Sequence, residues 1–321
     1  MTRSLTLHNF YPPGRPESGL LERFAARATE LGAGAVGVVH GGGLGHDDSA
    51  ALEWAGRWDG NGGQTGQGGL ALIWSVFMRA RSAELDAAYI MGSARDLEEH
   101  QRALPHLERF LADMLDEAGI VPVAFWPSPV LTISVFARER PVTRLDDLHG
   151  RRLRVFSRDL EPTFGRLGID ARFIPQSELH DALARGAFDA TVYPACHTAW
   201  SVPLWRVTQH ASYLFPEALP PYVLACPRPL WEALDDTARD ALREAGRAVW
   251  PDFLRLSVDP TDEQAARRNL VAAGLTWHSD HSPEDRWRFT RSARETWAEM
   301  TAAASPRTQA LQQTLLAAMA P

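Results

Sequence analysis

Lysine is missing from this chain, whose 321 residues include 33 basic residues that are all arginine. Without lysine the protein cannot form a Schiff base with pyridoxal phosphate, and it cannot build the phosphate-binding loop that ends in lysine. The Gly-x-Ser-x-Gly elbow of many hydrolases and the His-Glu-x-x-His zinc motif are also absent. These absences exclude several large classes of enzyme.

Long apolar runs and basic tracts are missing as well. No run approaches the roughly 20 apolar residues of a membrane span, and the opening MTRSLTLHNF lacks the apolar core of a signal peptide. The 33 basic and 40 acidic residues are spread along the chain and leave a net charge of −7. A nucleic-acid partner is therefore not expected, whereas the length suffices for a large core divided into two lobes.

Cysteine is scarce, because Cys196 and Cys226 are the only two. They are compatible with one disulfide in an oxidising compartment or with two buried thiols. Sequence spacing does not supply the geometry that a disulfide requires, so both possibilities stay open.

Metal-ligating side chains gather at two places. His278, Asp280 and His281 form the denser group, and the His-Asp-Asp run at 46–48 is the second. Short polar groups between periodic segments are typical of solvated turns, so neither a metal site nor catalytic residues are expected. The glycine cluster at 41–45 lacks the spacing of a phosphate-binding loop, and no cofactor is expected. A metal-dependent enzyme is the least favoured alternative.

The stretch from residue 141 to 194 carries most of the functional information. It predicts the order strand, helix, strand, helix, strand, at about 152–156, 160–167, 171–174, 176–185 and 188–193. Gly168 and Gly186 end the two helices, since glycine adopts the left-handed cap conformation. This order is typical of a parallel sheet with right-handed crossovers. In such sheets ligands bind beyond the carboxyl ends of the strands, here at Arg154, Gln176 and Tyr193.

Similar patterns divide the rest of the chain. Strands are expected at 4–9, 34–40, 70–74, 121–126, 130–137 and 222–226. Helices are expected at about 18–28, 50–58, 106–118, 229–249, 261–273 and 283–303, and residues 209–221 are expected to form a loop. Pro127 and Pro129 interrupt the strand pattern, which favours a crossing between lobes there.

Two motifs of the central stretch resemble a known family. The first is Leu145-Asp146-Asp147-Leu148-x-Gly150-x-x-Leu153-Arg154-Val155, and the second is the Pro-x-x-Glu-x-x-x-Ala-Leu-x-x-Gly-x-x-Asp run from Pro175 to Asp189. Together they resemble the solute-binding proteins of tripartite ATP-independent periplasmic (TRAP) transporters. The resemblance implies an α/β, two-lobed periplasmic-binding-protein-like fold, in which each lobe is a mostly parallel sheet flanked by helices, with a long C-terminal helical region. The lobes expected are 1–125 plus 212–250, and 126–211 plus 251–321.

The resemblance also implies a function that is not enzymatic. Such a protein binds a small organic acid by hinge closure and delivers it to the membrane permease subunits of the transporter. It is expected in the periplasm, with its leader removed from this numbering; a protein that never leaves the cytoplasm is the other reading. A ligand sensor that signals to a partner would use the same cleft and remains an alternative.

Arg154 is the residue that the resemblance assigns to the ligand carboxylate. A guanidinium offers a rigid fork of donors that matches two carboxylate oxygens, and a closed cleft strengthens the pair by excluding water. The competing structural interpretation is an exposed arginine at a strand end, as is expected for Arg151, Arg152 and Arg158.

The sequence departs from the family pattern at several positions. Ser134 stands where many members carry a second arginine, and Gln176 replaces an aromatic residue. The ligand predicted is therefore a monocarboxylate with an apolar or aromatic body, held by one arginine. Trp74 could equally be a core residue. The expected ligand-binding residues are Arg154, Tyr193, Gln176, Trp74, Trp126, Asn9, Tyr11, Ser75 and Tyr213.

Overall fold

The structure is a computed structural model. It describes residues 3–9, 16–43, 69–75, 78, 83–128, 131–193, 199–200, 202–217, 221–259 and 261–320. The chain divides into two compact units. Unit 1 comprises the described parts of 1–86, 104–129 and 219–258, and unit 2 those of 87–103, 130–218 and 259–321.

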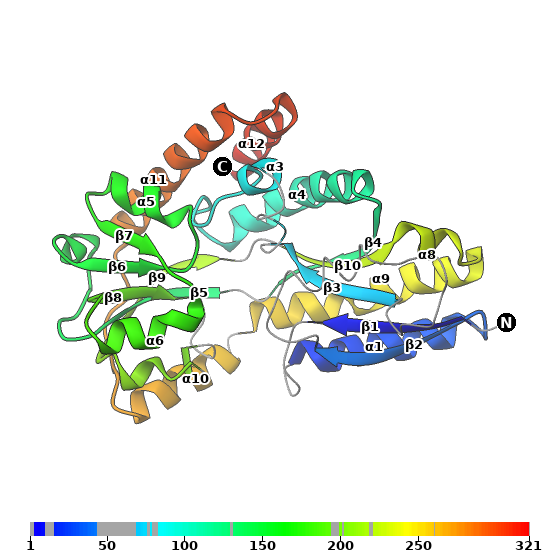
Figure 1. The fold of residues 1–321 in the computed structure, drawn as a ribbon, viewed down its shortest axis with the longest axis horizontal. Coiled ribbons are helices and arrows are strands. Elements are labelled where there is room, and N and C mark those ends of the chain that lie inside the picture. The colour runs from blue at the N-terminus through cyan, green and yellow to red at the C-terminus, as the bar shows by residue number, and fades with distance from the viewer. Residues whose placement is uncertain are drawn as a thin grey trace. The chain divides into compact units, whose positions relative to one another are not determined.

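Unit 1 is built on a five-stranded sheet (Figure 1). Its strands are, in spatial order, β2 (Val36–Gly43), β1 (Arg3–Asn9), β3 (Gly69–Trp74), β10 (Tyr222–Pro227) and β4 (Ile120–Trp126). All are parallel except β10, which runs antiparallel to both of its neighbours. β3 and β10 are buried along nearly their whole length, as continuous apolar runs in a covered sheet should be.

Helices α1 and α9 pack together on one face of this sheet (Figure 1). The helices that belong wholly or partly to unit 1 are α1 (Pro16–Leu31), α3 (Ala83–Ala87), α4 (Leu97–Glu117), α8 (Arg228–Glu232) and α9 (Asp236–Val258). Trp126 lies at the centre of the core between sheet and helices. Its ring stacks on Phe253 at a centroid distance of 4.5 Å, and its indole N–H donates to the Gly246 carbonyl at 2.9 Å.

Unit 2 is built on a six-stranded sheet that, like the first sheet, is parallel except for one strand. Its strands are, in spatial order, β11 (Thr276–Trp277), β9 (His210–Glu217), β5 (Leu131–Ala137), β8 (Ala190–Tyr193), β6 (Arg152–Val155) and β7 (Asp170–Phe173). Only β5 is antiparallel to its neighbours. β6, β7 and β8 are the three parallel strands predicted from the central stretch, and the structure places them in the spatial order β8, β6, β7.

Helices cover both faces of this second sheet (Figure 1). The helical elements are η2 (Leu145–Leu148), α5 (Leu160–Arg166), α6 (Gln176–Ala184), η3 (Leu204–Arg206), α10 (Thr261–Ala272), α11 (Pro283–Ala302) and α12 (Pro306–Met319). Phe289 of α11 contacts Phe164 and Phe215 on one face. Leu179 of α6 and Leu270 of α10 belong to the cluster on the other.

Two of the passages of the chain between the units, those that follow β4 and β9, run between the carboxyl edges of the sheets. β4 ends at the carboxyl edge of the first sheet, and antiparallel β5 begins at the carboxyl edge of the second. The chain returns in the same way: β9 ends at the carboxyl edge of the second sheet, and antiparallel β10 begins at the carboxyl edge of the first. The one antiparallel strand of each sheet is thus the strand that follows a crossing.

Two predicted elements differ from the structure, and one helix was not predicted. The loop expected over 209–221 is wrong, because 210–217 form β9. Leu214 is an extra residue in the pairing with β5, and this bulge interrupts the period-two pattern that identifies a strand. The helix expected over 229–249 is divided into α8 and α9, since the Asp235 carboxylate accepts a hydrogen bond from the Ala238 backbone and caps α9. α12 was not expected, and the helix expected at 50–58 lies outside the described residues.

The structure also divides the chain at positions other than those expected. Residues 87–103 lie in unit 2, where the Trp297 indole donates to the Ala87 carbonyl and Arg294 pairs with Glu99 at 2.9 Å. Residues 212–217 stay in unit 2 because β9 continues to pair with β5. Residues 251–258 stay in unit 1 as the end of α9.

Trp126→Ala tests the packing of unit 1. We expect the free energy of unfolding to fall by about 3–5 kcal/mol, because the change opens a large cavity and leaves the Gly246 carbonyl without its donor. Urea denaturation followed by far-ultraviolet circular dichroism measures it. The control is Trp250→Ala, in which the removed ring is 40% exposed; a similar loss there would contradict the interpretation.

Candidate functional site

Arg154 lies near the carboxyl end of β6 and is only 1% exposed. Strand alternation turns it to the face opposite Leu153 and Val155, which fill the core. Its Nε and Nη2 groups both donate to the carbonyl of Ile174, at 3.2 and 2.9 Å. Ile174 directly follows β7, so two neighbouring parallel strands position the guanidinium.

Two buried polar atoms at this edge have no hydrogen-bond partner among the described residues. They are Nη1 of Arg154 and the hydroxyl of Tyr193. Tyr193 is the last residue of β8, the strand beside β6, and is 1% exposed. The Arg154 guanidinium carbon lies 6.0 Å from the centre of the Tyr193 ring. A ligand atom that accepts hydrogen bonds would satisfy the donors that the fold leaves open.

Arg154 and Tyr193 together carry one buried positive charge, that of the guanidinium. Burial lowers the pKa of Arg154 to about 10, and burial raises the pKa of Tyr193 to about 12. At neutral pH the guanidinium is therefore charged and the phenol is neutral. No carboxylate pairs with Arg154 in the described part of the chain. Because an unpaired buried charge is costly, an anionic ligand would recover free energy that the empty protein forgoes.

The same edge holds no second arginine on β5. Ser134 pairs with Tyr193 across β5 and β8, and its hydroxyl donates to the Thr132 carbonyl at 3.0 Å. Arg138 lies beyond the other end of β5, where its backbone N–H bonds to Asp189. Arg151, expected to be exposed, is buried. Its guanidinium folds back onto the chain and donates to the carbonyls of Arg140 and Pro141.

Gln176 and Tyr213 are the other candidates in unit 2. Gln176 is exposed at the first position of α6, two residues beyond Ile174. Tyr213 lies on β9, half-buried, with the Arg286 guanidinium 6.0 Å from its ring. Burial raises the pKa of Tyr213. The structure thus brings Tyr193 to Arg154, and it describes no contact of Gln176 or Tyr213 with that guanidinium.

The described candidates in unit 1 lie at the carboxyl ends of strands or directly after them. Asn9 ends β1 and is buried, and Trp74 ends β3, half-buried against the core. Ser75 follows Trp74, and its hydroxyl donates to the Pro221 carbonyl at 2.8 Å. Trp126 ends β4, with its ring in the core and its N–H already donated. Tyr11 lies outside the described residues.

His40 is a neighbour of this set that sequence reasoning missed. Its Nε2 lies 2.6 Å from the Asn9 side-chain nitrogen. β1 and β2 are parallel neighbours, which brings the two side chains together. The signal available in the sequence was its place near the end of a predicted strand.

A serine, a histidine and an aspartate also meet in unit 2. The Ser212 hydroxyl lies 3.1 Å from Nε2 of His281, and Nδ1 of that ring lies 4.0 Å from Asp285. The serine hydrogen is donated to the Val142 carbonyl at 2.6 Å, so the imidazole must donate to the serine. A nucleophilic serine requires the reverse. All three are buried, and burial lowers the pKa of His281.

No metal-ligand set is found within the described ranges. In them, no group of three or more His, Cys, Asp or Glu side chains could hold an ion. Nε2 of His278 lies 3.1 Å from Nδ1 of His210. Cys226 is a buried free thiol whose pKa burial raises to about 12. Cys196 and residues 46–48 lie outside the described residues. None of the described helices is long and apolar enough to span a membrane.

Comparison with known proteins supplies the family. Residues 69–304 match the family described as bacterial extracellular solute-binding protein, family 7. A curated relative from Chromohalobacter salexigens, described as a solute-binding protein, is 26% identical over 287 residues, which cover 83% of this chain and 76% of the relative.

Solved structures resemble this chain along nearly its whole length. A TRAP periplasmic solute-binding protein from Ochrobactrum anthropi superposes with a TM-score of 0.81 at 18% identity, covering 99% of this chain and 95% of that one. One from Chromohalobacter salexigens with bound D-glucuronate has a TM-score of 0.77 at 20% identity, covering 98% and 99%. A Bordetella pertussis extracytoplasmic solute receptor that binds pyroglutamic acid has a TM-score of 0.73 at 16% identity, covering 98% and 99%. The predicted two-lobed α/β fold class is confirmed.

Arg154→Met tests whether the guanidinium stabilises the empty protein. The change keeps most of the side-chain volume and removes the charge. We expect the free energy of unfolding at pH 7 to stay unchanged or to rise by up to about 2 kcal/mol. With a pKa of about 10 in the fold, the group is charged at pH 7 in both folded and unfolded states, so the burial penalty applies fully there.

Urea denaturation without ligand measures this effect. The control is Arg151→Met, which removes a buried guanidinium that bonds two carbonyls, and we expect it to cost about 1–3 kcal/mol. If Arg154→Met costs as much as the control, Arg154 is a structural residue.

Proposed function

This chain belongs to the bacterial extracellular solute-binding proteins of family 7, and from that premise we propose that it captures a small organic acid in the periplasm and delivers it to a TRAP membrane permease. The family consists of solute receptors and not of enzymes. No chemistry on the ligand is therefore required of the site, only recognition and release.

The observation that carries the proposal is the buried guanidinium without a counter-charge. In the proposed complex, a ligand carboxylate accepts hydrogen bonds from Nη1 of Arg154 and from the Tyr193 hydroxyl, the two donors left open. A charge-assisted hydrogen bond in a site without water contributes on the order of 1.5–3 kcal/mol. The side of the guanidinium that faces Ile174 is already occupied, so the ligand approaches from Nη1.

The proposed ligand carries one carboxylate. With Ser134 on β5, the edge that holds Arg154 offers one guanidinium and neutral groups around it. The acids named for the similar structures, glucuronate and pyroglutamate, also have a single carboxylate each. Tyrosine and tryptophan rings among the candidates favour a body that is apolar or aromatic over a second charge.

The proposed mode of binding is hinge closure. Two of the crossings between the units are the connections that follow β4 and β9, and connections at the ends of strands can change direction without repacking either core. Ligand stabilises the closed form only by the additional contacts it makes there. Candidates from both units lie at the carboxyl edges of their own sheets.

Arg154→Ala tests the residue on which the proposal depends. We expect the affinity for an organic acid to fall at least tenfold, because the variant loses a charged hydrogen bond of about 1.5–3 kcal/mol. Isothermal titration calorimetry with the tightest-binding acid measures the change, and circular dichroism establishes that the variant is folded.

The matched control is Arg172→Ala on the neighbouring strand β7. Arg172 is paired in register with Arg154, but its side chain is 69% exposed. Its removal should leave affinity unchanged. Tyr193→Phe should weaken binding by a smaller factor, since it deletes one neutral donor. Unchanged affinity in Arg154→Ala would remove that residue from the site.

A panel of acids tests the charge of the ligand. Calorimetry should show binding of monocarboxylates such as pyroglutamate, glucuronate or an aromatic acid, and weaker binding of succinate and other dicarboxylates of similar size. The reason is that a second carboxylate would be desolvated without a cation. Preference for a dianion would contradict the prediction while leaving the receptor role intact.

A further inference from the structure

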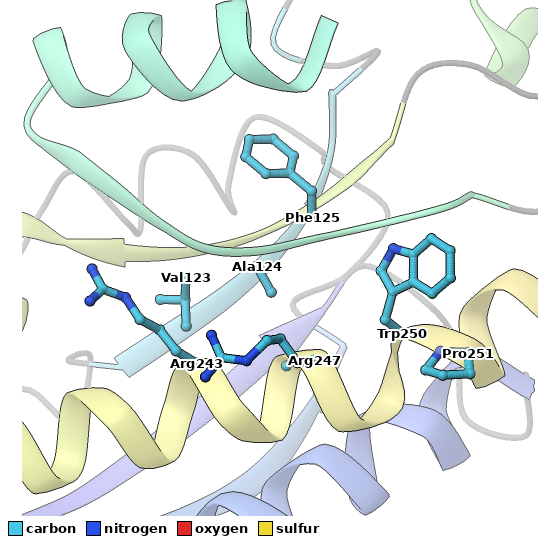
Figure 2. A pocket seen from close by; sticks show the side chains of 8 residues that line it. Val123, Ala124, Phe125, Arg243, Arg247, Trp250 and Pro251 are labelled. Atoms are coloured by element: carbon cyan, nitrogen blue, oxygen red, sulfur yellow. The ribbon is translucent and has the colours of Figure 1, made fainter. Parts of the chain in front are cut away.

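Helix α9 carries a second stripe of residues beside the one that enters the core. The core stripe is Ala238, Ala241, Leu242, Ala245, Val249 and Phe253. Arg243, Gly246, Arg247 and Trp250 recur at positions i, i+3, i+4 and i+7, so they share another face of the helix. This face borders a groove of about 400 Å³ between α9 and strand β4 (Figure 2).

The floor of the groove is made by small residues. Gly246 faces Ala124 of β4 so closely that a Cβ atom at Gly246 would lie 2.9 Å from the Cβ of Ala124. The Gly246 carbonyl also accepts the Trp126 indole N–H, which fixes the helix against the strand. Glycine inside a helix costs about 1 kcal/mol relative to alanine. Here the missing side chain of Gly246 permits the close approach of α9 to β4. It also leaves the depression that the long side chains of α9 border.

The strand along the groove is the edge of its sheet. β4 is the last of the five strands, and β10 is its only hydrogen-bonded strand neighbour among the described residues. An edge strand presents backbone groups on which an extended chain can align. Pro122 limits pairing at the amino-terminal half of β4, whereas Ala124 and Phe125 line the groove.

The groove is cationic, although the chain as a whole carries a net charge of −7. The Arg243 guanidinium lies 4.9 Å from the Trp231 ring and has no carboxylate partner within the described residues. Arg247 pairs with Glu244 at 2.6 Å, but both side chains are more than half exposed, so the pair contributes little and can exchange. Trp250 adds an indole that is 40% exposed at the end of the stripe (Figure 2).

We propose that this groove is a docking site for an extended acidic segment of a partner protein. The segment lies along β4, directs Asp or Glu side chains to Arg243 and Arg247, and places an apolar side chain against Trp250. Alternate residues of an extended chain point to the same side, which matches a charged stripe that ends in an indole. The site lies within unit 1 and uses none of the candidate ligand residues, so it is independent of the proposed acid binding.

The chemistry of the groove suits a transient contact. Exposed arginines bind carboxylates weakly and in a salt-dependent manner. A receptor that delivers its ligand repeatedly must leave its partner after each encounter. A weak, charge-steered docking site meets that requirement.

Short labelled peptides test the proposal in fluorescence anisotropy with the full chain. The probe is a peptide that alternates Asp or Glu with Leu or Phe, with both termini blocked so that no terminal carboxylate reaches Arg154. Two further peptides replace the acidic residues by Asn and Gln or by Lys. We expect the acidic peptide to bind below about 1 mM, at least about tenfold tighter than the other two, and to weaken as salt rises.

Variants locate the site. Arg243→Ala with Arg247→Ala, and separately Trp250→Ala, should weaken the acidic peptide at least about fivefold. Arg255→Ala, an exposed arginine of the same helix that does not line the groove, should leave binding unchanged. Arg154→Ala should also leave it unchanged, which separates this test from that of acid binding.

Three results would overturn the proposal. They are equal affinity for acidic and neutral peptides, equal loss in Arg255→Ala, and absence of binding by the acidic peptide at about 1 mM. Sedimentation that detects a dimer abolished by Arg243→Glu would instead assign the groove to a second copy of this chain and would refute the occupant proposed.

Discussion

A buried guanidinium that no carboxylate of the described residues neutralises is the constraint on which the proposed site depends. Arg154 is held by one carbonyl, that of Ile174, and the described residues offer no hydrogen-bond partner to its Nη1 or to the Tyr193 hydroxyl. Such an arrangement lowers the free energy of unfolding, so the surrounding fold must supply enough stability to offset that loss. The apolar side chains of β6 and β8 that enter the core meet this need, since burial of their surface offsets the penalty. A protein selected for stability alone would replace the charge by a hydrocarbon of similar size.

The topology explains why polar candidates collect where they do. Each sheet has one antiparallel strand, β10 or β5, and each follows a passage of the chain from the other unit. These two passages run from carboxyl edge to carboxyl edge, and Asn9, Trp74, Arg154 and Tyr193 lie at the same edges, at or near the carboxyl ends of parallel strands. The parallel strands supply these positions, and the antiparallel ones return the chain. Trp126 shows that position at a strand end is insufficient, since its ring turns inward and stacks on Phe253.

The two arginine sites of this chain differ in their physics. Arg154 is shielded from water, so in the proposed complex one hydrogen bond to a carboxylate would carry much of the binding and salt would have little access. Arg243 and Arg247 are exposed on α9, where solvent screens each contact and only several together produce a measurable affinity. The first arrangement suits selective retention of a small molecule. The second suits brief and repeated contact with a protein. The difference in exposure to water arises from the face of the strand or helix on which each arginine lies.

The sequence by itself indicated the family through the resemblance of two motifs, and it determined the α/β class and the chain order of the central elements. That order depends on local periodicity and on glycines such as Gly168 and Gly186, which adopt φ of 75° and 72°. It also located Arg154 at a strand end. Only the tertiary structure decided that Nη1 stays unpaired, that Arg151 is buried, that 210–217 form a strand, and that the Trp126 N–H is taken by Gly246. These features depend on partners far away in the chain, here up to 120 residues. Local patterns report a residue's own preference, whereas burial and hydrogen bonding are settled by which distant groups the fold brings beside it.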